Sequence, residues 1–250
     1  MVGVKRIASV SFGKDSLAML LRLLEEGWPL DEVVFYDTGM EFQAIYDIRD
    51  RVSSILEERG IRYTELQPDY DFEWKMFDKP VNGRNGFRYG YSWCGGRCRW
   101  GTTDKLTVIE RYARGNIEYV GIAADEVSRL EKERNGTKVF PLSEWRMTEA
   151  DCLSYCYERG FTWEEDAGAG KVRLYDVLDR VSCWCCANKN LKELRNMKRM
   201  LPEYWQRLED LQRRTARPMK GAGKSVFELG ERFEQEEKRD GGSDTPKGCA

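Results

Sequence analysis

The stretch "IASVSFGKDSLAMLLRLLEEG", residues 7–27, decides the fold, because a short polar turn joins an apolar segment to an amphipathic one. Residues 4–12 are rich in β-branched side chains, which is typical of a buried strand. Five leucines then recur at helical spacing between positions 17 and 24, and Gly27 is a typical helix end. The hexapeptide "SFGKDS", residues 11–16, is therefore predicted to form a strand-to-helix turn.

The composition of this turn indicates an anion site. Gly13 lets the backbone approach a ligand closely, and free N–H groups at a helix start can hold an anion. Hydroxyl groups of Ser11 and Ser16 add donors, and Lys14 adds a positive charge. The spacing differs from a Walker loop, which places four residues between Gly and Gly-Lys-Ser/Thr. We predict a phosphate cradle with Lys14 and Asp15 exposed on it; the simpler alternative is a polar turn without a ligand.

The composition also limits the class of protein. At 250 residues and 41% hydrophobic residues, the chain can form one large domain or a domain with a small addition. No apolar run reaches 18 residues and the N-terminus lacks a signal-peptide pattern, so we expect a soluble, cytoplasmic protein without a membrane partner. Histidine is absent, which excludes His-dependent triads and His-ligated zinc. Eight cysteines then suggest metal or sulfur chemistry rather than disulfides.

Predicted strands alternate with predicted helices along the chain. Further strands are expected at 32–37, 61–66 and 117–123, and further helices at 42–59, 103–113 and 148–159, with Thr148 as an N-cap. This alternation implies an α/β fold, layered, with a mostly parallel sheet flanked by helices. In residues 71–100 the apolar side chains follow neither a helical nor a strand spacing, so this segment is expected to form a functional loop.

Charge divides the chain into three sections. Residues 1–170 carry 23 basic against 30 acidic side chains and are predicted to form a nucleotide-binding α/β domain. Residues 171–224 carry 14 basic against 6 acidic side chains. We expect 171–230 to be a helical, cysteine-containing section packed on the domain, with a kink or a new helix start at Pro202, and 231–250 to be a disordered tail. The basic 171–224 section suits nucleic acid as a partner, and a solvated basic helix face is the alternative.

Polar clusters follow two of the other predicted strands. Residues 37–41 read "DTGME" and residues 121–129 read "GIAADEVSR". Ligands of open α/β sheets bind at the carboxyl ends of the strands, so Asp37, Thr38 and Glu41 are candidates for nucleotide contacts. An ordinary strand-to-helix turn at Gly39 is the alternative.

The cysteines form two close pairs. Cys94 and Cys98 are separated by three residues, Cys183 and Cys186 by two, and 84 residues lie between the pairs. This pattern fits a four-thiolate site for zinc or an iron–sulfur cluster. Cys185 lies inside the second pair and leaves the choice of ligands open. Cys152 and Cys156 are four apart on a predicted helix and are expected to be small core residues.

The hexapeptide resembles the pyrophosphate-binding loop of the PP-loop ATP pyrophosphatases, in the adenine nucleotide alpha hydrolase-like superfamily. The branch it resembles contains the phosphoadenosine phosphosulfate (PAPS) reductases. The resemblance implies that an adenine nucleotide binds through three segments, with Lys14 and Asp15 catalytic. The residues carried over from the family are Ser11, Phe12, Gly13, Lys14, Asp15 and Ser16, then Asp37, Thr38, Gly39 and Glu41, then Gly121, Asp125, Glu126 and Arg129. Ala123 stands where the family's third segment has Arg, so one anion contact is lost or supplied from elsewhere.

The resemblance also helps to choose between the two activities found in the family, ATP cleavage and sulfonucleotide reduction. A lysine aimed at leaving pyrophosphate stabilises its charge, so Lys14 favours ATP chemistry with Mg²⁺. Reductases need a Glu-Cys-Gly-x-His tail, whereas this chain ends "GCA" at Cys249. We therefore predict an enzyme that adenylates a substrate and releases pyrophosphate, in a sulfur-transfer pathway acting on nucleic acid and served by a sulfur donor protein.

Two alternatives stay open. A PAPS or adenosine phosphosulfate reductase would take PAPS as substrate and release sulfite through Cys249. A non-enzymatic nucleotide- or nucleic-acid-binding module would use the cysteines for structural zinc. Some family members carry a [4Fe-4S] cluster on a similar cysteine pattern, which favours iron–sulfur at Cys94, Cys98, Cys183 and Cys186, with zinc as the alternative.

Overall fold

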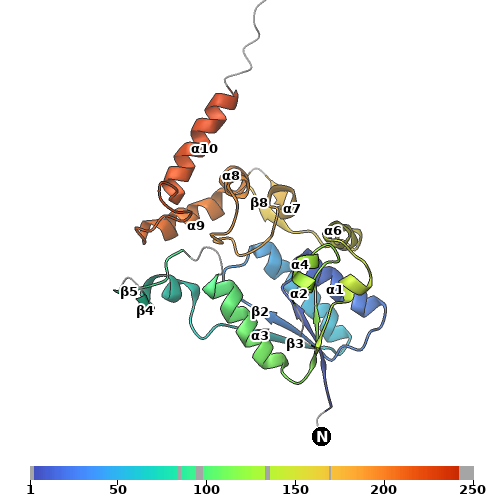
Figure 1. The fold of residues 1–250 in the computed structure, drawn as a ribbon. Helices are drawn as coiled ribbons and strands as arrows, with labels where there is room; N and C mark the ends of the chain where they lie inside the picture. The colour runs from blue at the N-terminus through green and yellow to red at the C-terminus, as the bar shows by residue number, and fades with distance from the viewer. Residues whose placement is uncertain (1–2, 84–85, 94–97, 133–135, 169, 242–250) are drawn as a thin grey trace, which may run out of the picture.

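A parallel sheet forms the centre of the molecule. The computed structural model describes residues 3–83, 86–93, 98–132, 136–168 and 170–241, and in this part of the chain the sheet has five strands in the order β3-β2-β1-β6-β7 (Figure 1). The strands are β1 (Arg6–Val10), β2 (Glu32–Tyr36), β3 (Arg62–Leu66), β6 (Ile117–Val120) and β7 (Lys138–Val139). Ile7 on the middle strand pairs with Glu32 on one side and Glu118 on the other. The predicted layered α/β fold is confirmed.

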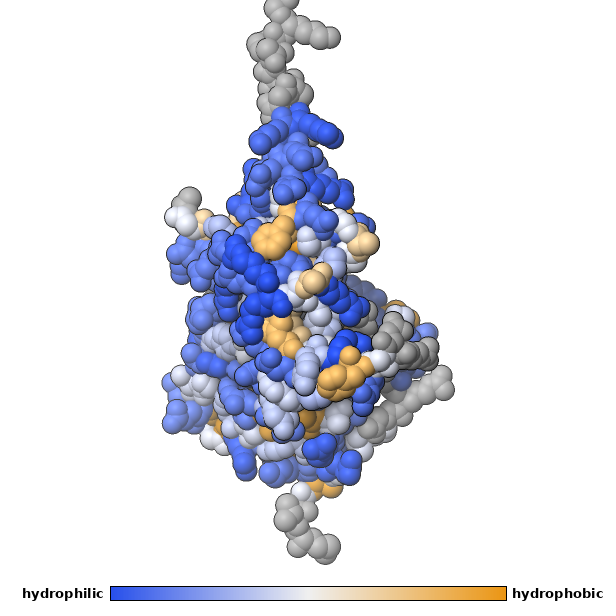
Figure 2. All heavy atoms as spheres, turned by 90° about the vertical axis from the view of Figure 1, so that its left-hand side faces the viewer, coloured by the Kyte–Doolittle hydropathy of each residue, from blue (hydrophilic) through white to orange (hydrophobic). Residues whose placement is uncertain are grey.

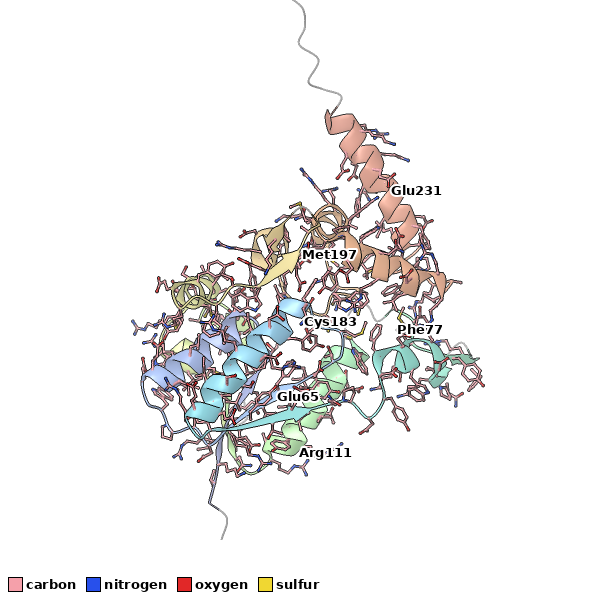
Figure 3. The ribbon with its side chains drawn as sticks, turned by 180° about the vertical axis from the view of Figure 1, so that it is seen from behind. Glu65, Phe77, Arg111, Cys183, Met197 and Glu231 are labelled. Carbon is pink, nitrogen blue, oxygen red and sulfur yellow. The ribbon has the colours of Figure 1, made fainter. Side chains whose placement is uncertain are left out.

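Helices cover both faces of this sheet (Figures 1 and 3). α1 (Lys14–Glu25) and α2 (Gln43–Glu58) lie on one face, and α6 (Glu149–Glu158) packs against α1. α3 (Lys105–Ala113) lies on the other face, where Ala113 packs with Ile7 and Val34. The leucine stripe of α1 is buried because it faces the larger core between helices and sheet. The predicted N-cap is confirmed, since Thr148 and Asp151 form a capping box at the start of α6.

The segment predicted as an irregular loop contains short regular elements. They are the π-helical turn η1 (Trp74–Asp78), the antiparallel hairpin of β4 (Pro80–Gly83) and β5 (Gly86–Tyr89), and the turn η2 (Arg99–Asp104) before α3. Gly90 allows this compaction, because its φ is 69° and a Cβ there would lie 2.1 Å from the carbonyl oxygen of Met76. Such close packing has no periodic signal in the sequence.

A helical section follows the sheet. Two short helices flank the last strand of the sheet, α4 (Val127–Leu130) before β7 and α5 (Pro141–Glu144) after it. After α6 come the hairpin of β8 (Glu164–Asp166) and β9 (Lys171–Arg173), and then α7 (Leu174–Val177). α8 (Leu191–Met200) and α9 (Pro202–Arg213) follow, so the chain starts a new helix at Pro202 as expected.

The C-terminal helix is longer than expected. α10 (Val226–Gly241) continues past residue 230, where the sequence suggested a disordered tail. Phe233 is buried against Trp205 of α9, with ring centroids 6.0 Å apart, and this contact explains why the helix continues. Residues 242–250, including Cys249, lie outside the described residues. In the described ranges, no helix combines the length and apolar character that a membrane span requires.

Candidate functional site

A pocket of about 220 Å³ lies at the carboxyl end of β1. It brings together residues from segments far apart in the sequence, five of which belong to the predicted turn. Its lining residues are Ser11, Gly13, Lys14, Asp15, Ser16, Gly121, Glu126, Arg129, Glu149, Tyr175, Asp179, Arg180 and Val181. The predicted phosphate cradle and part of the 121–129 segment thus share one pocket at the strand ends, where open parallel sheets bind ligands.

The one apolar residue of the turn, Phe12, anchors it to the core. Phe12 has a left-handed φ of 56°, and its fully buried ring packs on Phe35 with centroids 5.0 Å apart. Its carbonyl oxygen accepts a hydrogen bond of 2.8 Å from the indole N–H of Trp163. The Phe12 side chain therefore belongs to the core, and only its backbone can contribute to a nucleotide site.

Glycines allow the backbone to close around the pocket. Gly13 is the N-cap of α1 and makes no side-chain cap, so the first N–H groups of the helix keep capacity for an anion. The Lys14 N–H does donate to the Tyr175 hydroxyl at 2.8 Å. A Cβ on Gly121 would lie 2.8 Å from the Cα of Ser16, so only glycine lets the end of β6 approach the start of α1 this closely.

Lys14 is the electrostatic centre of the pocket. Its side chain is buried rather than exposed on the turn, with 8% of the residue accessible, and its Nζ lies 2.6 Å from Glu149 and 2.8 Å from Asp15. Burial lowers the pKa of Lys14, but the hydrogen bonds and charges of Asp15 and Glu149 raise it further, so its pKa lies above the ordinary value. Burial in turn raises the pKa of Asp15. Lys14 therefore stays charged at neutral pH.

Two arginines also line the pocket. Arg129 pairs with Glu126 at 3.2 Å. Arg180 is exposed, and its guanidinium has no ion pair with any carboxylate of the described residues. Among the pocket's cations within the described ranges, Arg180 is thus the one whose charge is not already matched by an acidic side chain.

The predicted 37–41 cluster lies outside the lining of this pocket. Asp37 accepts hydrogen bonds from the Tyr46 hydroxyl and from the Gly39 N–H, each 2.8 Å long. The Thr38 hydroxyl donates to Glu41 at 2.9 Å and lies 3.5 Å from the Cys183 sulfur. The structure therefore places Thr38 and Glu41 beside the second cysteine pair, at the end of β2.

Asp125 supports the pocket indirectly. It does not line the cavity, but its carboxylate accepts the Glu149 N–H at 3.1 Å. This bond satisfies a free N–H in the first turn of α6, which is the turn that presents Glu149 to Lys14. Its role is to position another side chain.

Cysteines from both predicted pairs meet near Gly101. A Cβ on Gly101 would lie 3.8 Å from the Cys183 sulfur and 4.0 Å from the Cys98 sulfur, so the absence of a side chain leaves room between them. The Gly101 N–H donates to the Cys98 sulfur at 3.2 Å. Cys183 and Cys186 flank a tight turn in which the Cys186 N–H donates to the Cys183 carbonyl at 3.0 Å. Figure 3 shows Cys183 where the sheet meets the C-terminal helices.

The donor chemistry here suits a thiolate-bound metal. Cys98, Cys183 and Cys186 are all partly exposed free cysteines. The Cys98 sulfur has a backbone N–H beside it and the Cys183 sulfur has a hydroxyl, which are the partners that metal-bound sulfur commonly has. Within the described ranges, no three Cys, Asp or Glu side chains are close enough together to hold a metal ion. Cys94, the fourth predicted ligand, lies outside the described residues. The four-cysteine site stays a prediction.

The remaining described cysteines are packed in the core. Cys152 and Cys156 on α6 are fully buried, as expected for structural residues, and burial raises the pKa of Cys156 to about 12. Burial raises the pKa of both Cys183 and Cys185 well above the ordinary value, but Cys185 is buried in the main core cluster whereas Cys183 and Cys186 are partly exposed. This packing favours Cys183 and Cys186 over Cys185 as the accessible pair.

Sequence reasoning did not find several residues of the pocket. Glu149 lies in the first turn of a predicted helix, where an acidic residue is common, so only the tertiary contact with Lys14 marks it. Tyr175, Asp179, Arg180 and Val181 reach the pocket from a segment about 160 residues after the turn. The only hint in the sequence was that Arg180 lies three residues before Cys183, a predicted site residue.

A family model matches the first part of the chain. The pocket lies at the end of the first strand of a parallel sheet, beside a helix start that carries a buried lysine. Residues 5–92 match the model of the phosphoadenosine phosphosulfate reductase domain. This match confirms the predicted resemblance to the phosphoadenosine phosphosulfate reductases over this part of the chain.

Similar whole proteins are distant. Two uncharacterized proteins of Methanocaldococcus jannaschii are each 25% identical to this chain, over 85% and 82% of its length. The matches cover 43% and 47% of those proteins, so the chain spans less than half the length of these relatives. The U34-tRNA thiolase NcsA from Methanococcus maripaludis, solved with its [4Fe-4S] cluster, is 14% identical with a TM-score of 0.45, over 99% of this chain and 76% of that one. This likeness is too distant to carry an inference.

Proposed function

We propose that the chain binds ATP in the pocket and cleaves it between the α- and β-phosphates. A buried, charged Lys14 at the turn of a PAPS reductase domain is the observation that carries this proposal. An acceptor oxygen would attack the α-phosphorus, the bond to the bridging oxygen would break, and the electron pair would leave on pyrophosphate. The acceptor would become adenylated, and its proton would pass to a carboxylate of the pocket.

The pocket residues have distinct roles in this reaction. Lys14 and the first N–H groups of α1 would hold the leaving pyrophosphate, whose charge grows as the bond breaks. Asp15, whose pKa burial raises, would accept the proton. Mg²⁺ prefers oxygen ligands and would neutralise phosphate charge when bound with the nucleotide. The carboxylates that line the pocket are Asp15, Glu126, Glu149 and Asp179; no three of them are close enough to hold the ion alone, so phosphate oxygens would complete its ligands.

Arg180 would supply the anion contact that Ala123 cannot make. Ala123 is fully buried at the end of β6, whereas Arg180 lines the same pocket from the segment after α7. Because its guanidinium has no acidic partner in the described residues, it is available to a phosphate oxygen. The contact would thus come from the segment after α7 instead of the segment after β6.

We further propose nucleic acid as the acceptor, with sulfur supplied by a donor protein and handled at the cysteines. Residues 171–224 contain 14 basic and 6 acidic residues, and such a positive section suits a polyanion, which supports this acceptor. α10 neutralises part of that charge, because Arg195 pairs with Glu236 and Lys198 with Glu234. The face that carries β4, β5 and α9 is mostly hydrophilic with separate apolar patches (Figure 2). A nucleic acid would therefore contact the basic side chains that α10 leaves unpaired.

One assay tests these proposals against their alternatives. The purified protein is incubated with Mg²⁺ and either ATP or PAPS, with bulk tRNA or DNA as acceptor, and pyrophosphate and sulfite are measured. Pyrophosphate from ATP, increased by one nucleic acid and lost in Lys14→Met, supports adenylation. Sulfite from PAPS with thioredoxin would assign a reductase instead. Release of neither product would leave a binding module and refute the proposed reaction.

A further inference from the structure

One face of the β4–β5 hairpin carries two exposed aromatic rings. Phe87 and Tyr89 of β5 are 60% and 68% exposed, and their ring centroids lie 5.1 Å apart at an interplanar angle of 83°. Alternate residues of a strand point to the same face, so both rings belong to one face of the hairpin. On this face the strand register places the exposed residue Asn82, whose side chain is an amide, opposite Phe87. Large apolar side chains that gather on a surface indicate a binding site.

The hairpin is fixed to the rest of the molecule. At its base the Gly90 N–H donates to the Lys79 carbonyl at 2.7 Å. The next two N–H groups, of Tyr91 and Ser92, donate to carbonyl oxygens of η1 at 3.0 and 2.8 Å. Val81, on the face opposite the two rings, is buried. The rings are thus presented to solvent on a braced support, which lowers the entropy cost of binding a partner.

The charge of this segment is positive. Residues 79–100 carry five basic and no acidic side chains. Arg88 is exposed on the hairpin, and the Lys79 Nζ lies 5.3 Å from the centre of the Tyr91 ring at its base. In the described part of the chain neither of these two cations is ion-paired with a carboxylate. Aromatic rings interleaved with unpaired cations suit a ligand that combines flat rings with phosphates.

The hairpin also adjoins the basic section of the chain. The segment that carries η1 contacts the end of α9, because Arg214 pairs with Glu73 and its guanidinium lies 3.9 Å over the Phe77 ring. The hydroxyl groups of Ser92 and Thr215 lie 2.9 Å apart. Figures 1 and 3 show the hairpin at the outer edge of the molecule, next to the end of α9. A polyanion held by the basic section could therefore extend onto the hairpin.

We propose that this hairpin face binds unpaired bases of a single-stranded nucleic acid segment. Each ring can stack on one base, and the Asn82 amide can hydrogen-bond to a base edge. The bases of a duplex are already stacked and paired, so they cannot reach the rings. An apolar protein surface would not need the excess of positive charge, so the observations favour nucleic acid. The inference rests on the nucleic-acid part of the proposed function and names the form of nucleic acid; it does not depend on ATP cleavage.

Oligonucleotide binding tests the inference. The full chain is titrated, in the absence of ATP, against a fluorescently labelled unstructured RNA strand, the DNA strand of the same sequence and the corresponding DNA duplex. Fluorescence anisotropy gives the dissociation constants, and melting temperatures are measured for each variant. Phe87→Ala and Tyr89→Ala each remove one ring, Phe87→Leu keeps an apolar side chain without a ring, and Phe87→Tyr keeps the ring. Phe227→Leu changes an exposed aromatic residue of α10 and is the control.

The expected pattern separates base stacking from general attraction. The wild type should bind at least one single strand more tightly than the duplex, and the tighter strand identifies the preferred sugar. Each alanine variant should weaken single-strand binding about 5- to 150-fold, because a base stacked on an aromatic ring contributes about 1–3 kcal/mol. Phe87→Leu should be weakened as well, whereas Phe87→Tyr and Phe227→Leu should resemble the wild type. Melting temperatures should not change, since both rings are exposed.

Three results would overturn the inference. Equal affinity for single strands and duplex, or wild-type affinity in both alanine variants, would leave nucleic acid as a partner of the basic section only. Equal binding by Phe87→Leu and Phe87→Tyr would show that stacking is not involved. No binding to any of the three oligonucleotides would refute both this inference and the proposed nucleic-acid acceptor. Release of pyrophosphate from ATP is measured separately and would be unaffected by any of these results.

Discussion

Gly121→Ala should disturb the pocket through a single methyl group. The new Cβ would lie 2.8 Å from the Cα of Ser16 and 3.0 Å from its N, both backbone atoms at the start of α1. Ordinary contacts of a Cβ begin at 3.4 Å, so β6 and α1 must separate by about half an ångström. Neither atom belongs to a flexible side chain that could rotate away, and the turn that carries Lys14 must move with the helix start.

Two effects follow from this displacement. Overpacking of this kind costs about 1–3 kcal/mol of the free energy of unfolding. A shift of a catalytic group by about 1 Å can lower the rate about 100-fold, so a shift of half that size at Lys14 should lower turnover about tenfold. The loss should exceed what the change in folded fraction can explain, because 1–3 kcal/mol leaves a typical domain mostly folded.

Gly136→Ala is the matched control, since a Cβ there meets nothing within 4 Å. Both variants are compared with the wild type by denaturant unfolding and by ATP-dependent release of pyrophosphate. Gly121→Ala should be destabilised and slow, and Gly136→Ala should resemble the wild type. Equal stability and turnover of the two variants would refute the close approach of β6 and α1.

Three further substitutions or deletions probe the site. Lys14→Met should lower pyrophosphate release about 10²- to 10³-fold; it should also destabilise the fold by about 1–3 kcal/mol, because Asp15 and Glu149 lose their shared cation. Wild-type turnover in this variant would remove the basis of the phosphate cradle. Arg180→Ala should raise the dissociation constant for ATP about 10- to 100-fold, because a charged hydrogen bond is worth about 1.5–3 kcal/mol. Arg217→Ala removes an exposed arginine away from the pocket and should leave this constant unchanged; equal effects of the two substitutions would exclude Arg180 as a phosphate contact. Deleting 242–250 leaves α10 whole and should leave pyrophosphate release unchanged, whereas thioredoxin-dependent sulfite formation lost with Cys249 would establish the reductase alternative.

Local patterns in the sequence were enough for the first unit of the fold. Strand, turn and leucine stripe lie within 21 consecutive residues, so each is visible in a short window. The burial of Lys14 was not visible, because its carboxylate partner Glu149 is 135 residues away. Phe12 was similarly ambiguous, since only the left-handed backbone turns its ring into the core.

The far end of the chain shows how composition misleads. Residues 231–241 are so rich in charge that they resemble a solvated tail, yet Phe233 and the preceding Leu229 are buried against the other helices. Acidic residues of the same helix pair with Arg195 and Lys198, which lowers the basic charge that the sequence assigned to 171–224. Charge counts along a sequence cannot include such pairs between helices.

The segment between α7 and α8 connects the two parts of the site. Asp179, Arg180 and Val181 line the pocket at the end of β1, and the cysteine turn begins only two residues later, at Cys183. Glu193 fixes both ends of this segment, because one oxygen accepts the Arg180 N–H and the other accepts the Asn190 N–H. A phosphate held by Arg180 and a metal held by Cys183 would therefore act on one short, braced stretch of backbone. If binding of one ligand changes the affinity for the other through this stretch, the reverse effect must have the same factor, since binding free energies are reciprocal.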